Sequence, residues 1–116
     1  MSGLLTTHVL DTANGKPAAG MPIELFVIKG EERRSIETFT TNADGRTDTP
    51  LLPQEEFGVG LYEIVFDVAG YFAGEMLPDP PFLGRVPIRF GVADPDAHYH
   101  VPLLVSPWSY STYRGS

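Results

Sequence analysis

Short runs in which apolar and polar residues alternate recur along the chain, and they predict strands rather than helices. Alternation is typical of a half-buried strand, because successive side chains point to opposite faces of the sheet. It is clearest at residues 85–92, where Val86, Ile88, Phe90 and Val92 are expected to face the core. The predicted strands are residues 4–10, 21–29, 34–41, 60–68, 85–92, 98–105 and 108–114.

Glycine and proline divide these runs into short pieces. The chain has 12 glycines and 11 prolines, and both residue types mark turns and loops. Seven or eight short strands at this spacing indicate an all-β protein, either a sandwich or a barrel. With no linker in the sequence, residues 1–116 are expected to form a single domain. The remaining segments are predicted to be a loop at 11–17, a short extended segment at 46–49, a polar irregular stretch at 50–57, a short helix at 70–76 and a proline-rich loop at 77–83.

Charge and composition exclude several classes of function. The formal net charge of −7 argues against binding to nucleic acid or to an anionic membrane, since both need a basic face. A small substrate is compatible with it, because a local pair of arginines can outweigh the overall sign. The absence of cysteine excludes disulfides, thiol nucleophiles and thiolate metal sites. The sequence shows no signal-peptide pattern and no apolar run near the ~20 residues that span a membrane, so a cytoplasmic location is expected.

The three histidines are the first candidates for chemistry. His98 and His100 lie two residues apart in a predicted strand, so their imidazoles share one face, while Tyr99 and Val101 point the other way. They could be solvated surface residues, or metal ligands with His8 or an acid as the third ligand. One of them could instead be a general base, because the usual histidine pKa of about 6.5 suits that role. Nothing in the spacing requires a metal, and no metal or cofactor is expected.

The C-terminal residues and one arginine form a second candidate group. Tyr113, Arg114 and Ser116 follow an apolar, aromatic run and supply a phenol, a guanidinium and a hydroxyl within a short segment. Such groups suit a pocket for a small polar molecule. Arg46 follows the turn signal at residues 41–45 and offers a second guanidinium, whose flat fork matches an oxyanion or a polar heterocycle. Taken alone, Arg46 would be a turn-flanking charge and Arg114 part of a frayed end.

Both ends of the chain resemble the signatures of the transthyretin-related proteins. The final Tyr-Arg-Gly-Ser is characteristic of the enzymatic branch of that family, the 5-hydroxyisourate hydrolases. The resemblance covers essentially the whole chain, although the middle motifs are less specific than the terminal ones. The matching segments are residues 5–12 (LTTHVLDT), 15–18 (GKPA), 42–46 (NADGR), 57–62 (FGVGLY), 98–104 (HYHVPLL) and 106–116 (SPWSYSTYRGS).

The resemblance implies a particular fold and assembly. The fold would be a transthyretin-like (prealbumin-like) β-sandwich of two four-stranded sheets with one short helix. The assembly would be a homotetramer, in which subunits pair through their last strands and two such dimers pack face to face around a central channel. The active sites would lie in that channel, at the dimer–dimer interface.

The resemblance also implies a reaction in purine catabolism. The substrate would be 5-hydroxyisourate, the unstable product of urate oxidation, and the product 2-oxo-4-hydroxy-4-carboxy-5-ureidoimidazoline. In this hypothesis His100, with His8, activates water, while the arginines hold substrate oxygens and the developing negative charge. Tyr113 and Ser116 orient substrate or water, and the role of His98 stays open. The implied catalytic residues are His8, Arg46, His100 and Ser116, and the implied substrate-binding residues are His8, Arg46, Tyr113 and Arg114.

The alternative is a non-enzymatic, transthyretin-like binding protein for a small ligand. The carrier branch of the family uses the same fold and channel without catalysis. It has non-catalytic side chains at the positions of His8, Arg46 and His100, and its chain does not end in Tyr-Arg-Gly-Ser. This sequence carries the enzymatic residues at all of these positions, which favours the hydrolase.

Overall fold

The structure is a computed structural model, and it describes residues 3–52 and 56–116. Short strands dominate these two ranges, and a single turn of helix directly follows the strand Gly60–Asp67. In chain order the elements are β1 (Leu5–Thr6), β2 (Val9–Asp11), β3 (Lys16–Pro17), β4 (Pro22–Lys29), β5 (Glu32–Thr40), β6 (Gly60–Asp67), α1 (Val68–Tyr71), β7 (Arg85–Val92), β8 (Tyr99–His100), β9 (Leu103–Val105) and β10 (Tyr110–Thr112).

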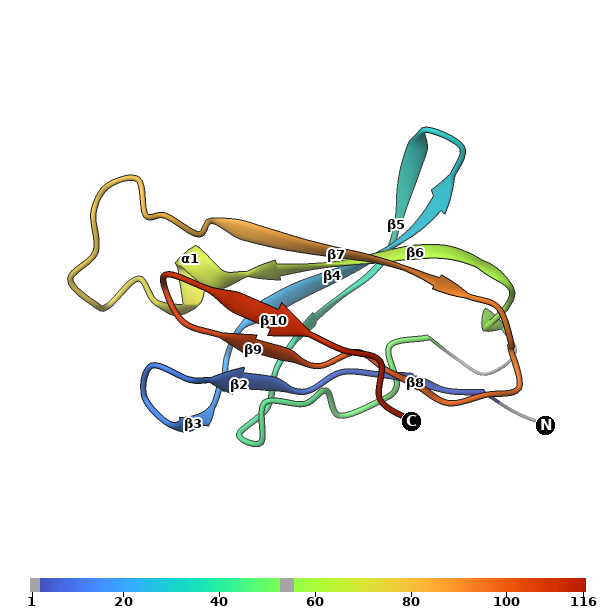
Figure 1. Cartoon of the computed structure of the whole chain (residues 1–116), viewed down its shortest axis with the longest axis horizontal. Helices are drawn as coiled ribbons and strands as arrows, with labels where there is room; N and C mark the ends of the chain where they lie inside the picture. The colour runs from blue at the N-terminus through green and yellow to red at the C-terminus, as the bar shows by residue number, and fades with distance from the viewer. Residues whose placement is uncertain (1–2, 53–55) are drawn as a thin grey trace.

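Two four-stranded sheets lie face to face as a sandwich (Figure 1). One sheet has the strand order β5-β4-β6-β7 and the other the order β10-β9-β2-β3, while β1 and β8 form a separate parallel pair. The hydrophobic core is built from both sheets, with Leu25, Ile64 and Phe66 from the first and Val9 and Leu103 from the second, all fully buried. Burying each such side chain contributes about 1.5–3 kcal/mol. The predicted all-β fold of two four-stranded sheets is therefore confirmed.

The segments with the clearest alternation are the best predicted. The strand predicted at residues 85–92 is β7, with the same bounds. Val86 and Val92 are buried in the core, and Ile88 and Phe90 pack against it, as expected. The predictions at 21–29, 34–41, 60–68 and 108–114 correspond to β4, β5, β6 and β10 with slightly different ends, and the loop predicted at 77–83 contains no helix or strand.

Two predicted strands are each interrupted, and the interruptions lie opposite one another. The first predicted strand splits into β1 and β2 at Thr7 and His8, and the sixth splits into β8 and β9 at Val101 and Pro102. Pro102 has no backbone N–H to donate. The Thr7 hydroxyl donates to the Val101 carbonyl at 2.7 Å, so a side chain occupies this acceptor. The two runs nevertheless stay parallel on both sides of the break.

The helix prediction is correct in kind and wrong in position. The sequence predicts it at residues 70–76, whereas α1 spans Val68–Tyr71. Asp67 caps the helix, and its Oδ1 accepts a hydrogen bond from the Gly70 amide at 3.0 Å. Glycines within the predicted range disfavour its continuation. Within the two described ranges, no helix has the length and apolar character needed to cross a membrane.

Three other local predictions need correction. The loop predicted at residues 11–17 contains β3, an edge strand that tolerates Pro17 because its outer side needs no partner. Residues 46–49 form no strand, and they line a pocket instead. The stretch predicted as polar and irregular at 50–57 contributes the buried Leu51 and Leu52 to the core. Residues 53–55 of that stretch lie outside the described residues.

A buried carboxylate joins the β2–β3 turn to α1. Asp11 accepts hydrogen bonds from the Asn14 amide (2.9 Å), from Asn14 Nδ2 (2.8 Å) and from the Tyr71 hydroxyl (2.7 Å). Burial alone raises the pKa of Asp11, but the bonds from Asn14 and Tyr71 outweigh it and lower the pKa below the usual 3.8. Burial and the bond to Asp11 raise the pKa of Tyr71 to about 12, so its phenol keeps the proton that it donates.

Replacing Tyr71 with phenylalanine is expected to destabilise the fold in a pH-dependent way. The buried Asp11 carboxylate loses one donor, which costs about 1–3 kcal/mol of unfolding free energy near neutral pH. The pKa of Asp11 is lower in the folded than in the unfolded state. Its contribution is therefore present above about pH 4 and is lost as the pH falls through the folded pKa. Urea unfolding of both proteins across this range measures the difference.

The Asp11→Asn background supplies the control for this measurement. Tyr71→Phe should cost less there, because the hydroxyl no longer serves a buried charge. An equal cost in both backgrounds would show that the hydroxyl acts independently of the carboxylate.

Candidate active site

One pocket collects polar side chains from segments that are far apart in the sequence. Its volume is about 360 Å³. Thr6 comes from β1, His100 from β8 and His98 from the residue just before β8, while Arg46 lies in the segment before residue 50 and Ser116 in the C-terminal segment. The structure thus brings together three of the four residues expected to be catalytic, together with His98.

The turn at residues 42–46 positions Arg46. Asn42 Oδ1 accepts hydrogen bonds from the amides of Asp44 (2.9 Å) and Arg46 (3.2 Å), which closes the turn. Gly45 has a φ of 76°, and a Cβ built there would lie 2.3 Å from the Val9 carbonyl oxygen. The Gly45 carbonyl accepts a bond from the Val9 amide at 2.7 Å. Glycine is required here both by conformation and by this close approach to β2.

His8 lies next to this turn in a defined tautomer. Its Nε2 is 2.9 Å from the Asp44 carbonyl oxygen. A carbonyl oxygen can only accept, so Nε2 must carry a proton and donate. In the neutral ring Nδ1 is then the free nitrogen. His8 is near enough to His100 to affect the charge of that imidazole.

A threonine hydroxyl connects His100 of β8 with His98, which immediately precedes that strand. Thr6 Oγ1 lies 2.9 Å from His100 Nδ1 and 3.0 Å from His98 Nε2. The parallel pairing of β1 with β8 places Thr6 directly opposite His100. Sequence reasoning missed Thr6. A signal was present, because Thr6 lies two residues before His8 in a predicted strand, and the alternation puts both side chains on one face.

The electrostatic surroundings keep His100 neutral. Burial lowers the pKa of its half-buried imidazole below the usual 6.5, and electrostatic interaction with Arg46, His8 and His98 lowers it further. Near neutral pH the ring is therefore in the form that can accept a proton.

The C-terminal segment reaches this pocket through a backbone bridge. The His100 amide donates to the Gly115 carbonyl (3.2 Å), and the Gly115 amide donates to the His100 carbonyl (2.7 Å). The bridge carries Ser116 into the lining of the pocket. Gly115 packs so closely that a Cβ there would lie 3.1 Å from His100 Cδ2. A side chain at this position would therefore require the imidazole to shift by a few tenths of an ångström.

Tyr113 and Arg114 lie elsewhere in this protomer. Both line a separate pocket of about 250 Å³ beside β7 and β10. The Arg114 guanidinium carbon lies 4.3 Å above the centre of the Tyr99 ring, and Arg114 NH2 donates to the His98 carbonyl at 3.2 Å. These contacts hold the C-terminal segment against β8. The expected substrate-binding role of both residues stays a prediction.

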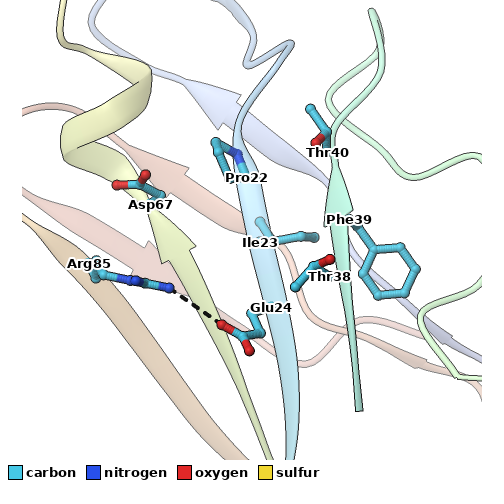
Figure 2. A pocket seen from close by; sticks show the side chains of 8 residues that line it. All are labelled: Pro22, Ile23, Glu24, Thr38, Phe39, Thr40, Asp67 and Arg85. Carbon is cyan, nitrogen blue, oxygen red and sulfur yellow. Dashed lines mark ion pairs between the residues drawn. The ribbon is translucent and has the colours of Figure 1, made fainter. Parts of the chain in front are cut away.

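The other pockets offer less chemistry. Figure 2 shows one of about 440 Å³, where Arg85 and Glu24 form an ion pair at 3.5 Å with Asp67 nearby. This lining carries two carboxylates and one guanidinium, and it contains no histidine. In residues 3–52 and 56–116, no three His, Asp or Glu side chains are grouped to hold a metal ion. That a metal is not required stays a prediction.

The sandwich and its histidine–arginine pocket define a transthyretin-like protein. Comparison with known families agrees, because the model described as the HIUase/Transthyretin family matches residues 5–115. The chain belongs to this family. A 5-hydroxyisourate hydrolase 2 from Rhizobium meliloti (strain 1021) is 59% identical over 117 residues, which cover 99% of this chain and 98% of that relative.

Two solved structures show how widely the fold is used. An (S)-allantoin synthase matches with a TM-score of 0.93 and 52% identity over 99% of this chain, which corresponds to 44% of that longer chain. Sea bream transthyretin in complex with thyroxine matches with a TM-score of 0.84 and 28% identity, covering 96% of this chain and 93% of its own. The same sandwich thus occurs in proteins of different function.

Replacing Gly115 with alanine is expected to disturb His100 specifically. The new methyl group would overpack the imidazole, which Thr6 holds at Nδ1, and overpacking costs about 1–3 kcal/mol of stability. Histidine NMR spectra should show shifted His100 ring resonances. Gly74→Ala is the matched control, because no atom lies within 4 Å of a Cβ at that position. His100 resonances that move equally little in both variants would contradict the packing argument.

Proposed function

We propose that this protein hydrolyses 5-hydroxyisourate to 2-oxo-4-hydroxy-4-carboxy-5-ureidoimidazoline in urate catabolism. The observation that carries the proposal is a neutral, half-buried His100 imidazole in one pocket with Arg46 and Ser116. Membership of the HIUase/Transthyretin family and the high identity to a 5-hydroxyisourate hydrolase support it. The reaction is the opening of a ring by water at an amide-like bond.

In the proposed mechanism His100 is the general base. Its Nδ1 is engaged with Thr6, which leaves Nε2 to take a proton from the attacking water. As water adds to the carbonyl carbon, negative charge develops on the oxygen, and Arg46 stabilises it. General-base catalysis and oxyanion stabilisation each contribute factors of roughly 10² to 10³. Ser116 orients substrate or water, and His8 assists from beside Arg46.

The assembly is also part of the proposal. We infer that residues 1–116 form one transthyretin-like domain and that four copies assemble as a dimer of dimers around a shared channel. β10 is the edge strand of its sheet, and an edge leaves backbone groups open to pairing with another strand. Tyr110 and Tyr113, in and beside β10, are exposed in the protomer. In this assembly Tyr113 and Arg114 contact substrate from the channel side.

A carrier function is the alternative, because the thyroxine-bound sea bream transthyretin has the same fold. Fold alone therefore does not decide between catalysis and binding. The side chains favour catalysis, since a general base beside a guanidinium serves hydrolysis and is not needed to hold an apolar ligand.

The direct test is an assay on freshly generated substrate. 5-Hydroxyisourate made from urate with urate oxidase should lose its ultraviolet absorbance faster with the protein than without it. His100→Asn and Arg46→Gln should each lower kcat/KM by roughly 10² or more. Arg34→Gln is the matched control, since Arg34 is an exposed residue of β5 in the sheet that does not line the pocket. Chelation should leave the activity unchanged. A decay rate equal to the spontaneous one would reject the hydrolase.

The pH dependence should report the pKa of His100. Because this pKa lies below 6.5, kcat/KM should fall only when the pH drops below that value, as the base becomes protonated. Removing the charge of Arg46 in Arg46→Gln should raise the pKa and move the acid limb of the profile to higher pH. Arg46→Lys keeps a positive charge and should leave the limb near its original position. An acid limb that moves to lower pH in Arg46→Gln would exclude His100 as the titrating base.

A further inference from the structure

The Thr6 hydroxyl is shared by two histidines of different exposure. It lies 2.9 Å from Nδ1 of the half-buried His100 and 3.0 Å from Nε2 of the exposed His98. A hydroxyl has one proton to donate, so it can donate to only one of these nitrogens. The other nitrogen must carry a proton and donate to Oγ1. The tautomers of the two neutral rings are therefore coupled through Thr6.

Only one of the two arrangements leaves a base that faces the pocket. If Thr6 donated to His100 Nδ1, then Nε2 of the neutral His100 would carry the proton and could not accept another. If His100 Nδ1–H donates to Thr6 and Thr6 donates to His98 Nε2, then His100 Nε2 is free. The second arrangement is also a continuous donor chain that runs from His100 to an imidazole in contact with solvent.

We propose that Thr6 relays the catalytic proton from His100 to His98, an inference that rests on the proposed hydrolase function. Water gives a proton to His100 Nε2 as its oxygen adds to the substrate carbonyl. The Nδ1 proton of His100 moves to Thr6 Oγ1, the hydroxyl proton of Thr6 moves to His98 Nε2, and His98 releases its Nδ1 proton to solvent. Each group thus passes on one proton for every proton that it gains. As the ring nitrogen of the substrate leaves, it takes the proton from His100 Nε2. The same chain then runs in reverse, from solvent through His98 and Thr6, and returns a proton to His100 Nδ1, which restores the starting tautomers.

The surroundings of His100 explain why such a route is useful. Electrostatic interaction with Arg46, His8 and His98 disfavours a positive charge on its imidazole. A proton left on His100 would therefore be held in an unfavourable place. His98 is exposed, and water can stabilise its charged form. Backbone contacts position the residues of this route. The pairing of β1 with β8 places Thr6 opposite His100. Arg114 donates a hydrogen bond to the His98 carbonyl and so holds His98 in place.

Substitutions separate a relay from simple positioning. Thr6→Val keeps the shape of the side chain without the hydroxyl and should lower kcat about tenfold or more, with KM nearly unchanged. Thr6→Ser keeps the hydroxyl and should stay within about threefold of the unaltered protein. His98→Gln can still accept a bond from Thr6 but cannot carry a proton, so it should also lower kcat. Imidazole added to the buffer should restore much of the activity of His98→Gln, because it can replace an exposed proton acceptor.

Thr12→Val is the matched control. It removes a threonine hydroxyl that donates to the Val105 carbonyl at 3.1 Å, outside the pocket, and should leave kcat unchanged. Nitrogen-15 NMR of the histidine rings gives a readout that does not depend on activity. In the unaltered protein near neutral pH, His100 should carry its proton on Nδ1, and His98 Nε2 should be unprotonated.

The outcomes distinguish failure of the relay from failure of the hydrolase. If the unaltered protein accelerates the decay of 5-hydroxyisourate but Thr6→Val or His98→Gln matches its kcat, the relay is wrong and the hydrolase stands. A proton on His100 Nε2 also rejects the relay. If Thr6→Val does not fold, the exposed His98→Gln variant and its rescue by imidazole decide the question. If the unaltered protein gives no acceleration, both proposals fail.

Discussion

The parallel pairing of two short, interrupted strands is the constraint on which the candidate site depends. The amides of Tyr99, Val101 and Leu103 donate to carbonyls of the N-terminal run at 2.8, 2.9 and 2.9 Å, which sets the register of β1 and β2 against β8 and β9. A slip by one residue would turn His98 and His100 into the core and bring Tyr99 to the pocket side. Because Tyr99 and Leu103 are buried, the core enforces the register that aligns the site.

The site gathers basic side chains although the chain as a whole is acidic. The protein has a formal net charge of −7, and the pocket holds Arg46 and two histidines, with Asp48 also in its lining and His8 close enough to act on His100. Many acidic groups are engaged elsewhere: Glu63, buried on the other sheet, pairs with Arg33 at 2.6 Å and Arg89 at 3.1 Å. Burial, together with electrostatic interaction with Arg46, His8 and His98, lowers the pKa of His100 and keeps that imidazole neutral, and the Arg46 guanidinium favours a developing oxyanion.

The transthyretin-like sandwich supplies a rigid frame and leaves the chemistry to a few side chains. Among the described residues, every buried side-chain nitrogen and oxygen has a hydrogen-bond partner, as the Asp11 cluster illustrates. The frame is also found in a thyroxine-bound transthyretin, so the frame itself selects no function. In this chain the frame carries a pocket in which strand pairing aligns Thr6 with His100, and the turn closed by Asn42 positions Arg46.

The sequence by itself determined the features that depend on neighbours along the chain. Alternation at residues 85–92 defined both the bounds of β7 and its buried face, and the two-residue spacing of His98 and His100 placed both on one side of a strand. Only the tertiary structure decided the features that join distant residues. The Thr6–His100 contact links positions 94 apart, and the Gly115 bridge carries Ser116 into a different pocket from Arg114. The bond from the Thr7 hydroxyl to the Val101 carbonyl lies at the level where both strands are interrupted. Local patterns encode which face a side chain takes, whereas hydrogen bonds across paired strands arise only when the register brings their donors and acceptors together.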